Sequence, residues 1–269
     1  MPHIVLTGAS GGLGWALAEA YAGPGVHLHL TGRDATRLSA LAETCRARGA
    51  VVATTALDLA MPGAAADFAR DVDAERPVDV ALACAGLTSS VRGDGCGETP
   101  EAVARVFAVN TLAVAGLLGT LAEAMRRRRR GALAVIGSLA GLRGQPCSPA
   151  YSASKAAALT YGEGLRAWLA PYGVTVTVVA PGFVDTPMSR RYRGAKPLLW
   201  RADRAAAAIV AAVAAGRPRL EFPWSLALGS RLLGLLPPRL GDAVLRRFFA
   251  FTVDPVPGEG RIAPPGETR

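Results

Sequence analysis

Tyr151 and Lys155 are four residues apart in an alanine-rich stretch that follows a loop rich in glycine and proline. Residues at this spacing lie on the same face of a helix, which places a phenol beside a cation. A phenol has an ordinary pKa of about 10, so it exchanges its proton near neutral pH only where a neighbouring positive charge stabilises the phenolate. Ser138, at the end of a strand-like run, can hydrogen-bond a substrate oxygen near that phenol. The three side chains therefore suit acid–base chemistry at an oxygen atom.

A glycine-rich turn is the second candidate site. It reads Thr7-Gly-Ala-Ser-Gly-Gly-Leu-Gly14, follows the first strand-like run and opens the first predicted helix. Glycine allows positive φ angles and lets a pyrophosphate approach bare amides, while the helix N-terminus favours negative charge. We therefore expect this turn to hold the phosphates of a dinucleotide cofactor, with contacts from Gly8, Ser10, Gly11, Gly12, Leu13 and Gly14.

Arg33 follows the second strand-like run, in Leu30-Thr-Gly-Arg-Asp34, where an acidic acceptor for a ribose 2′-hydroxyl would usually stand. An arginine suits a 2′-phosphate instead, through bidentate charge-assisted hydrogen bonds. This predicts NADP(H) in preference to NAD(H). The alternative is that Arg33 is a solvated turn residue.

The elements that must position these residues alternate along the chain. Strand-like runs are predicted at 3–7, 26–31, 51–55, 78–83, 132–137, 174–179 and 219–222, and helices at 12–22, 34–48, 62–74, 100–129, 150–170 and 202–215. The alternation predicts an α/β fold with a doubly wound, Rossmann-like parallel sheet of about seven strands and helices on both faces. Thr99 and Pro100 can begin the long helix, and Pro171 ends the helix that carries Tyr151.

Composition limits the remaining classes of function. Hydrophobic residues make up 51% of the 269, and no uninterrupted apolar run approaches a membrane span. The N-terminus shows no signal peptide, so we expect a cytoplasmic protein. Three histidines and the spacing of the four cysteines argue against a metal site or disulfide framework; the cysteines are Cys45, Cys84, Cys96 and Cys147.

The net charge of +9 is compatible with phosphate-bearing ligands, anionic lipid or nucleic acid. The run Arg126–Arg130 closes the long predicted helix, where cations complement the exposed carbonyl groups. Interleaved aromatic residues and a reading helix are missing around it, so nucleic-acid binding is not predicted.

Together these motifs resemble the short-chain dehydrogenase/reductase family over about residues 2–225. The motifs that carry the resemblance are Thr7-Gly8-x-x-x-Gly12-x-Gly14, Asp58, Ala85-Gly86, Asn110, Ser138, Tyr151-x-x-x-Lys155 and Pro181-Gly182. The family usually has two asparagines before Ala-Gly, where this chain has Ala83 and Cys84. That departure bears on local stability and cofactor affinity.

The resemblance implies a role for each matching residue. Tyr151 would be the general acid for carbonyl reduction or the base for alcohol oxidation, and Ser138 would orient the substrate oxygen. Lys155 would lower the pKa of the tyrosine and bind the nicotinamide ribose, while Asn110 would support a proton relay. The implied cofactor contacts elsewhere are Asp58 and Leu59 near adenine, Ala85 and Gly86 along the cofactor, and Pro181, Gly182, Val184 and Thr186 near the carboxamide. A homodimer or homotetramer is also implied.

Two segments near the C-terminus lack a defined role. Residues 188–196 are expected to form a mobile lid over the substrate. Residues 222–251 predict two short amphipathic helices separated by Pro237-Pro238, with arginines on one side. The hairpin can cover the substrate pocket, form a subunit contact or lie on an anionic membrane, and the first two are favoured over peripheral membrane contact through 226–251.

We therefore expect a catalytic domain over 1–225, a helical extension over 226–252 and a flexible tail over 253–269. The expected function is an NADP(H)-dependent oxidoreductase that interconverts a carbonyl and an alcohol, with Tyr151 as general acid or base and an apolar or lipid-like small-molecule substrate. The alternative is a non-catalytic NADP(H)-binding sensor or scaffold.

Overall fold

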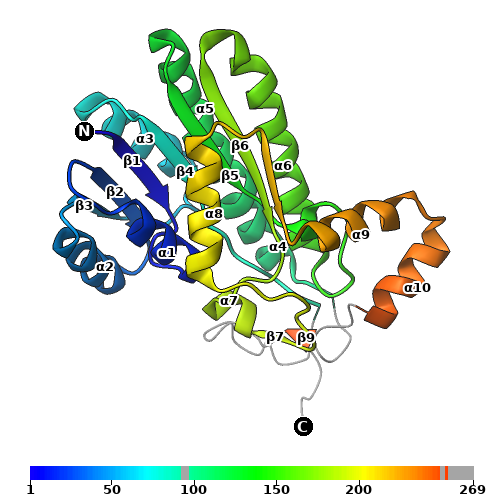
Figure 1. The fold of residues 1–269 in the computed structure, drawn as a ribbon. Helices are drawn as coiled ribbons and strands as arrows, with labels where there is room; N and C mark the ends of the chain where they lie inside the picture. Colours follow the sequence, from blue (N-terminus) through cyan, green and yellow to red (C-terminus); the bar gives the residue numbers. More distant parts are fainter. Residues whose placement is uncertain (92–96, 249–251, 254–269) are drawn as a thin grey trace.

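The computed structural model describes residues 1–91, 97–248 and 252–253. Its centre is a seven-stranded sheet in the order β3-β2-β1-β4-β5-β6-β8, with every neighbouring pair parallel (Figure 1). The strands are β1 (His3–Thr7), β2 (His27–Gly32), β3 (Val51–Ala56), β4 (Val80–Ala83), β5 (Gly131–Ile136), β6 (Val174–Pro181) and β8 (Arg219–Phe222). The strand order reverses beside β1, which opens a crevice at the carboxyl ends. The predicted Rossmann-like fold is confirmed.

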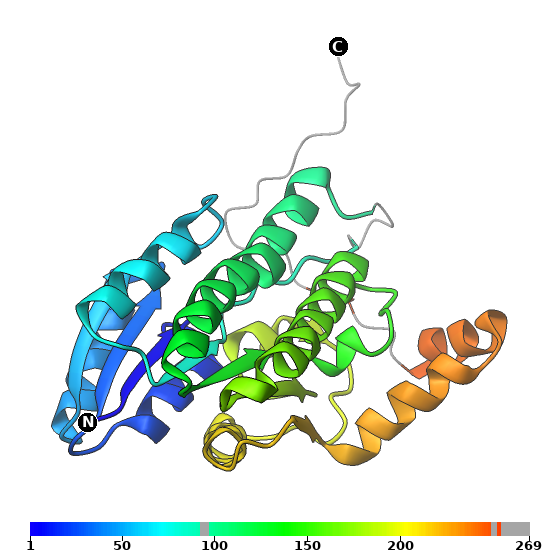
Figure 2. The same ribbon diagram turned by 90° about the horizontal axis from the view of Figure 1, so that it is seen from above.

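Helices cover both faces of the sheet (Figure 2). They are α1 (Gly12–Tyr21), α2 (Ala35–Ala47), α3 (Ala64–Glu75), α4 (Pro100–Phe107), α5 (Ala113–Arg128), α6 (Pro149–Leu169) and α8 (Ala202–Ala214). Side chains alternate along β1: Val5 belongs to the cluster with α3, α5 and α6, whereas Ile4 and Leu6 belong to the cluster with α1, α2 and α8. The near-continuous apolar strands follow from this burial on both faces.

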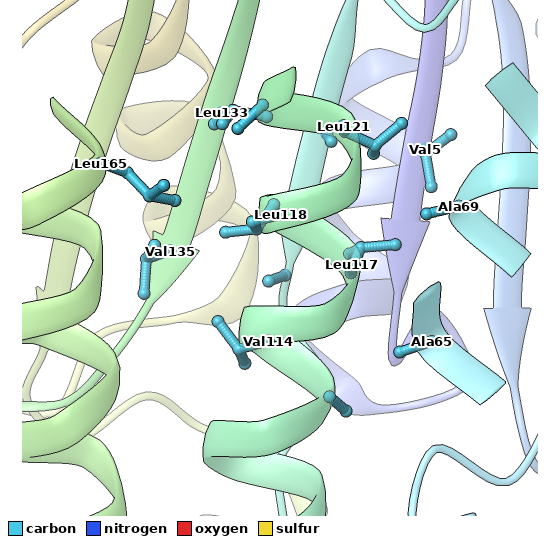
Figure 3. Close-up of a cluster of buried hydrophobic side chains, with 14 of the residues drawn as sticks. Val5, Ala65, Ala69, Val114, Leu117, Leu118, Leu121, Leu133, Val135 and Leu165 are labelled. Carbon is cyan, nitrogen blue, oxygen red and sulfur yellow. The ribbon is translucent and has the colours of Figure 1, made fainter. Parts of the chain in front are cut away.

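Helix α5 lies across the middle of one face. Leu117, Leu118 and Leu121 project from it toward the sheet, near Val5 on β1 and Leu133 on β5 (Figure 3). The helical run from α4 through α5 is long and apolar enough to cross a membrane. Because these leucines fill the interior of the domain, the run is better explained as a core helix.

The long helix predicted over 100–129 is present as one helical run, Pro100–Arg128, but it is not α-helical throughout. Five residues, Ala108–Leu112, form a π-helical turn between α4 and α5. The wider turn contains Asn110, whose side chain bonds to the backbone of Leu87 instead of facing solvent. π-Turns of this kind often mark functional positions, but residue periodicity does not reveal them.

The arginine run at the end of α5 is held by partners from neighbouring elements. Its first two residues, Arg126 and Arg127, pair with Glu123 of the same helix. The other three donate hydrogen bonds to neighbouring segments: Arg128 to Asp73, Arg129 to the Pro171 carbonyl oxygen and Arg130 to Asp79. These contacts support the interpretation of the run as a helix terminus.

The C-terminal segment forms the predicted pair of short helices, α9 (Trp224–Leu235) and α10 (Pro238–Phe248), which project from the body of the domain (Figure 1). Two further elements lie over the carboxyl edge: α7 (Pro187–Arg190) and β7 (Tyr192–Arg193). Strand β7 pairs antiparallel with β9 (Thr252–Val253). Apart from Val253, the predicted flexible tail lies outside the described residues.

The turn after β1 passes very close to the end of β4. Thr7 Oγ1 accepts hydrogen bonds from the Cys84 and Ala85 amides at 3.1 and 3.2 Å. A Cβ atom at Gly8, which has φ of +71°, would lie 2.6 Å from the Ala85 Cα. In the first turn of α1, a Cβ at Gly14 would lie 2.1 Å from the Gly8 carbonyl oxygen. Both glycines are therefore required by the packing of backbone against backbone.

We predict that Gly14→Ala lowers the free energy of unfolding by about 2 kcal/mol or more, because the added methyl must displace rigid backbone. Thermal unfolding without added cofactor measures the effect. Gly23→Ala is the matched control, since no atom lies within 4 Å of its Cβ position. Equal stability of the two variants would contradict the close approach.

Candidate active site

A cavity of about 480 Å³ opens at the carboxyl ends of the strands, in the volume range of small-molecule sites. The sequence-predicted residues that line it are Gly8, Ser10, Gly11, Gly12, Leu13, Gly14, Arg33, Asp58, Leu59, Ala85, Gly86, Ser138, Tyr151, Lys155, Pro181, Gly182, Val184 and Thr186. Asn110 is fully buried behind this lining. One cavity thus joins the glycine turn to the candidate acid–base residues.

The first turn of α6 fixes the position of Tyr151. Pro149 is the first residue of the helix, and Glu98 accepts a hydrogen bond from the Ala150 amide at 2.9 Å. Glu98 also accepts a bond from the Ser89 hydroxyl, which ties the helix start to the segment after β4. The sequence gives no sign of this carboxylate, because its partners are distant along the chain.

Lys155 is one turn further along α6 and only 4% exposed. Its Nζ donates a hydrogen bond to the Ile136 carbonyl oxygen at 2.9 Å and lies 5.9 Å from the centre of the Tyr151 ring. The predicted pairing of a phenol with a cation is therefore present in the fold. Burial lowers the pKa of Lys155 to about 8, an effect partly opposed by the neighbouring Cys84 thiol. The ammonium form still predominates at neutral pH.

Burial raises the pKa of the Tyr151 phenol above its ordinary value, and the nearby Tyr192 adds to the rise. A hydrogen bond with Ser138 acts in the opposite direction on the same pKa. From sequence, the Lys155 ammonium was expected to lower this pKa. Removal of the phenol from water has the larger effect here, so Tyr151 is held in its protonated form.

Ser138 lies where β5 leads into a short 3-10 turn, Leu139–Gly141. Its hydroxyl oxygen accepts a hydrogen bond from the Ala140 amide at 3.1 Å. That bond restricts the side chain at the mouth of the crevice, beside the Tyr151 phenol. The hydroxyl therefore lies where it can also bond a ligand oxygen.

Asn110 ties three segments together from its place in the π-turn. Its amide nitrogen donates to the Leu87 carbonyl oxygen at 2.9 Å and to Ser154 Oγ at 3.0 Å, and its oxygen accepts from the Leu87 amide at 2.8 Å. Ser154 in turn donates to the Tyr151 carbonyl oxygen at 2.8 Å. The side chain therefore holds the chain after Gly86 against α6.

The end of the cavity beside the glycine turn is basic. Arg33 is exposed and lines it, together with Arg37, which sequence reasoning did not select. Arg37 Nε donates to the Ser10 carbonyl oxygen at 2.9 Å, and its guanidinium lies 5.7 Å from the centre of the Trp15 ring. The sequence signal that could have selected Arg37 is its position four residues after Arg33, since α2 begins between the two residues.

Asp58 is held in the cavity lining by two contacts. Its Oδ1 accepts a hydrogen bond from the Ala60 amide at 3.0 Å, and its Oδ2 lies 3.5 Å from an Arg105 nitrogen. At the position where the family's second asparagine is expected, Cys84 also lines the cavity. Its backbone amide donates to Thr7 Oγ1 at 3.1 Å, which ties the end of β4 to β1.

The predicted lid, residues 188–196, and the C-terminal extension both contribute side chains to the cavity lining. Tyr192 of β7 lines the cavity, and its hydroxyl bonds Thr88 Oγ1 at 2.5 Å. Leu226 and Ser230 of α9 line it as well. These two residues were missed because their approach to the cavity depends on the direction of the hairpin, which local sequence does not encode.

Both the sequence and the fold are similar to those of known proteins. A sequence profile of the short chain dehydrogenase family matches residues 2–197. The chain belongs to the short-chain dehydrogenase family. It is 35% identical over 245 residues to a protein of Myxococcus xanthus (strain DK1622) called an uncharacterized oxidoreductase, a match covering 90% of this chain and 96% of that relative.

Solved structures agree with this family membership. A short-chain dehydrogenase from Sphingobium yanoikuyae in complex with NADPH superimposes with a TM-score of 0.75 at 26% identity, covering 88% of this chain and 97% of that one. A 3-oxoacyl (acyl-carrier-protein) reductase from Agrobacterium tumefaciens C58 with NADP bound gives 0.74 at 25% identity, covering 82% and 92%. The chain is therefore an oxidoreductase acting on CH–OH and C=O groups with NAD(P)(H).

The residues present fit such a cofactor. A Cβ at Gly12 would lie 2.8 Å from the Thr186 Cβ, so a side chain there would fill the passage between α1 and α7. A Cβ at Gly86 would lie 3.3 Å from Lys155 Nζ. Glycine at both positions keeps the cavity of this dehydrogenase open along its length.

The buried Lys155 ammonium predicts a pH-dependent stability. With a native pKa of about 8 and an ordinary value of 10.5, the unfolded chain binds more protons than the folded one between these limits. The contribution of Lys155 to the free energy of unfolding therefore rises with pH between these two pKa values. We predict that the free energy of unfolding of wild type relative to Lys155→Met increases by about 2 kcal/mol from pH 8 to pH 10.

Urea unfolding of both proteins across this range measures the difference, and the comparison cancels contributions from other groups. The control is Lys196→Met, which removes the chain's other lysine outside the cavity lining. A constant difference between wild type and Lys155→Met would show that the ammonium is not desolvated in the folded protein.

Proposed function

We propose that this dehydrogenase uses NADP(H) to interconvert a carbonyl and an alcohol on an apolar or lipid-like substrate, with Tyr151 as general acid or base. The observation that carries the proposal is the single cavity that joins Ser138, Tyr151 and Lys155 to the glycine turn and its two arginines. A protein that merely senses the cofactor would need the turn but not the acid–base set.

Each residue of the site has a separate role in the proposed reaction. When bound, the nicotinamide supplies or accepts the hydride. Ser138 binds the reacting oxygen, and the protonated phenol of Tyr151 donates its proton to that oxygen in the reductive direction. The Lys155 ammonium, 5.9 Å from the Tyr151 ring centre, stabilises the phenolate left behind. Asn110 positions α6 through Ser154 and is proposed to support reprotonation.

The preference for NADP(H) is supported by the pair of guanidinium groups beside the glycine turn. Arg37 is anchored on the Ser10 carbonyl oxygen, and Arg33 lies exposed at the same end of the cavity. Two guanidinium groups suit a 2′-phosphate, since each can donate paired charge-assisted hydrogen bonds. The related structures with bound NADPH and NADP are consistent with this preference.

The substrate end of the cavity supports an apolar substrate. Its lining away from the glycine turn is rich in hydrophobic side chains, namely Leu87, Leu139, Cys147, Met188 and Leu226. Polar side chains such as Gln145, Ser148 and Ser230 also line this part, but most of the cavity surface is apolar, so a few polar contacts fix the orientation of the substrate. This arrangement favours a ketone with hydrophobic substituents over a polyhydroxylated sugar.

We further propose a homodimer or homotetramer in the cytoplasm, as expected for the family. The outer helical layer offers large apolar side chains for a subunit contact, with Leu112 68% exposed and Trp168 on α6 43% exposed. Burial of such residues in a contact between copies would be favourable.

Tyr151→Phe tests the catalytic proposal. We predict that it lowers kcat by at least about 100-fold, because the proton donor is lost, while NADPH binding stays within about twofold. NADPH oxidation with a panel of apolar ketones measures turnover, and fluorescence titration measures binding. Full turnover by the variant would refute the role of Tyr151, and a wild type inactive on every carbonyl tried would favour a sensor.

Arg33→Ala and Arg37→Ala test the cofactor preference. We predict that each raises the Kd for NADPH by about 10-fold to 100-fold and leaves the Kd for NADH almost unchanged, because the lost hydrogen bonds are to the 2′-phosphate. Arg48→Ala is the control, since that arginine caps the other end of α2 and pairs with Glu19. Equal weakening of both cofactors would contradict 2′-phosphate recognition.

A further inference from the structure

Helix α9 presents an apolar face to solvent. Trp224, Leu228, Leu232 and Leu235 follow one another at helical spacing, with exposed fractions of 74%, 49%, 53% and 81%. Leu240, at the start of α10, is 54% exposed and extends the surface. We call these five residues the hairpin apolar face. A face of this size on a projecting hairpin indicates an interaction site.

The opposite side of the same helix belongs to the catalytic domain. Ala227 is buried in a cluster with Leu139 and Val178, and Leu226 and Ser230 line the active-site cavity. Helix α9 thus covers the cavity with its inner side, which is one of the two roles predicted from sequence ahead of membrane contact. The hairpin apolar face is a separate surface that this packing leaves outside.

The charges of the hairpin are predominantly positive. Its arginines are Arg231, Arg239, Arg246 and Arg247, and its one acidic residue within 224–248 is Asp242. The Asp242 carboxylate pairs with Arg143 of the loop before α6 at 3.0 Å, and Arg231 pairs with Glu221 of β8 at 2.6 Å, so the excess positive charge of the hairpin lies on α10. The apolar face is therefore accompanied by basic side chains, which is the charge pattern of helices that lie on anionic lipid.

We propose that the α9–α10 hairpin docks the enzyme on an anionic membrane surface. The hairpin apolar face enters the boundary between headgroups and acyl chains, and the arginines lie among the headgroups. A two-fold contact through this face would bring two positively charged hairpins together, so charge disfavours that occupant. Docking does not depend on the proposed reaction, although it would bring an apolar substrate to the helix that lines the cavity.

Vesicle binding of the full chain tests the proposal. Sedimentation is measured with vesicles of phosphatidylcholine alone and with equal parts of phosphatidylcholine and phosphatidylserine. We expect at least about tenfold stronger partitioning onto the anionic vesicles, weakening with added salt. Equal partitioning onto both compositions, or none onto either, would overturn anionic membrane docking.

Two sets of substitutions locate the surface. The triple variant Leu228→Ser, Leu232→Ser, Leu235→Ser and the double variant Arg239→Glu, Arg246→Glu should each lower partitioning at least about tenfold. Met61→Ser is the control, because Met61 is 62% exposed outside the hairpin and outside the cavity lining. Thermal unfolding and NADPH binding confirm that each variant is folded.

Analytical ultracentrifugation of wild type and the triple variant completes the test. Unchanged mass, together with lost vesicle binding, supports the proposal. A smaller assembly for the triple variant, with no vesicle binding by wild type, would assign the face to a second copy of the chain. Neither a loss of vesicle binding nor a change of assembly would alter the turnover test with Tyr151→Phe. The membrane proposal and the proposed function can therefore fail separately.

Discussion

The close packing of α6 against the sheet is the constraint on which the site depends. A Cβ at Gly162 would lie 2.8 Å from Val135 Cγ2, and one at Gly141 would lie 2.8 Å from the Ala156 amide nitrogen. These two glycines let the helix approach β5 and the turn that follows it. The Lys155 ammonium consequently reaches the Ile136 carbonyl oxygen, and the energetic cost of burying a cation is partly offset by that hydrogen bond.

The two ends of the cavity are built in different ways. At the phosphate end the backbone itself forms the surface, and glycines at positions such as Gly8 are dictated by distances of closest approach. The substrate end is assembled from side chains of the lid, the loop before α6 and helix α9. Substitutions at the first end are therefore limited by backbone packing, whereas side chains from late segments can vary with the substrate.

Much of the fold and the polar site followed from sequence because both rest on local patterns. Strand and helix alternation gave the parallel sheet, and the spacing of Tyr151 and Lys155 gave a shared helical face. Features that depend on tertiary contacts were not available in this way. The π-turn at Asn110 is stabilised by the backbone of Leu87, the helix start at Ala150 by Glu98, and the cavity contact of Leu226 by the path of a hairpin. The pKa of Tyr151 likewise depends on burial, which spacing alone does not reveal.

The pairing of β7 with β9 joins Tyr192 and Arg193 to residues some sixty positions later in the chain. Tyr192 also bonds Thr88, so this small ladder connects the substrate side of the cavity to the end of the C-terminal extension. A fusion partner joined immediately after Val253 would therefore be tethered to a wall of the reaction chamber. A partner joined before β1 would lie at the opposite ends of the strands from the cavity.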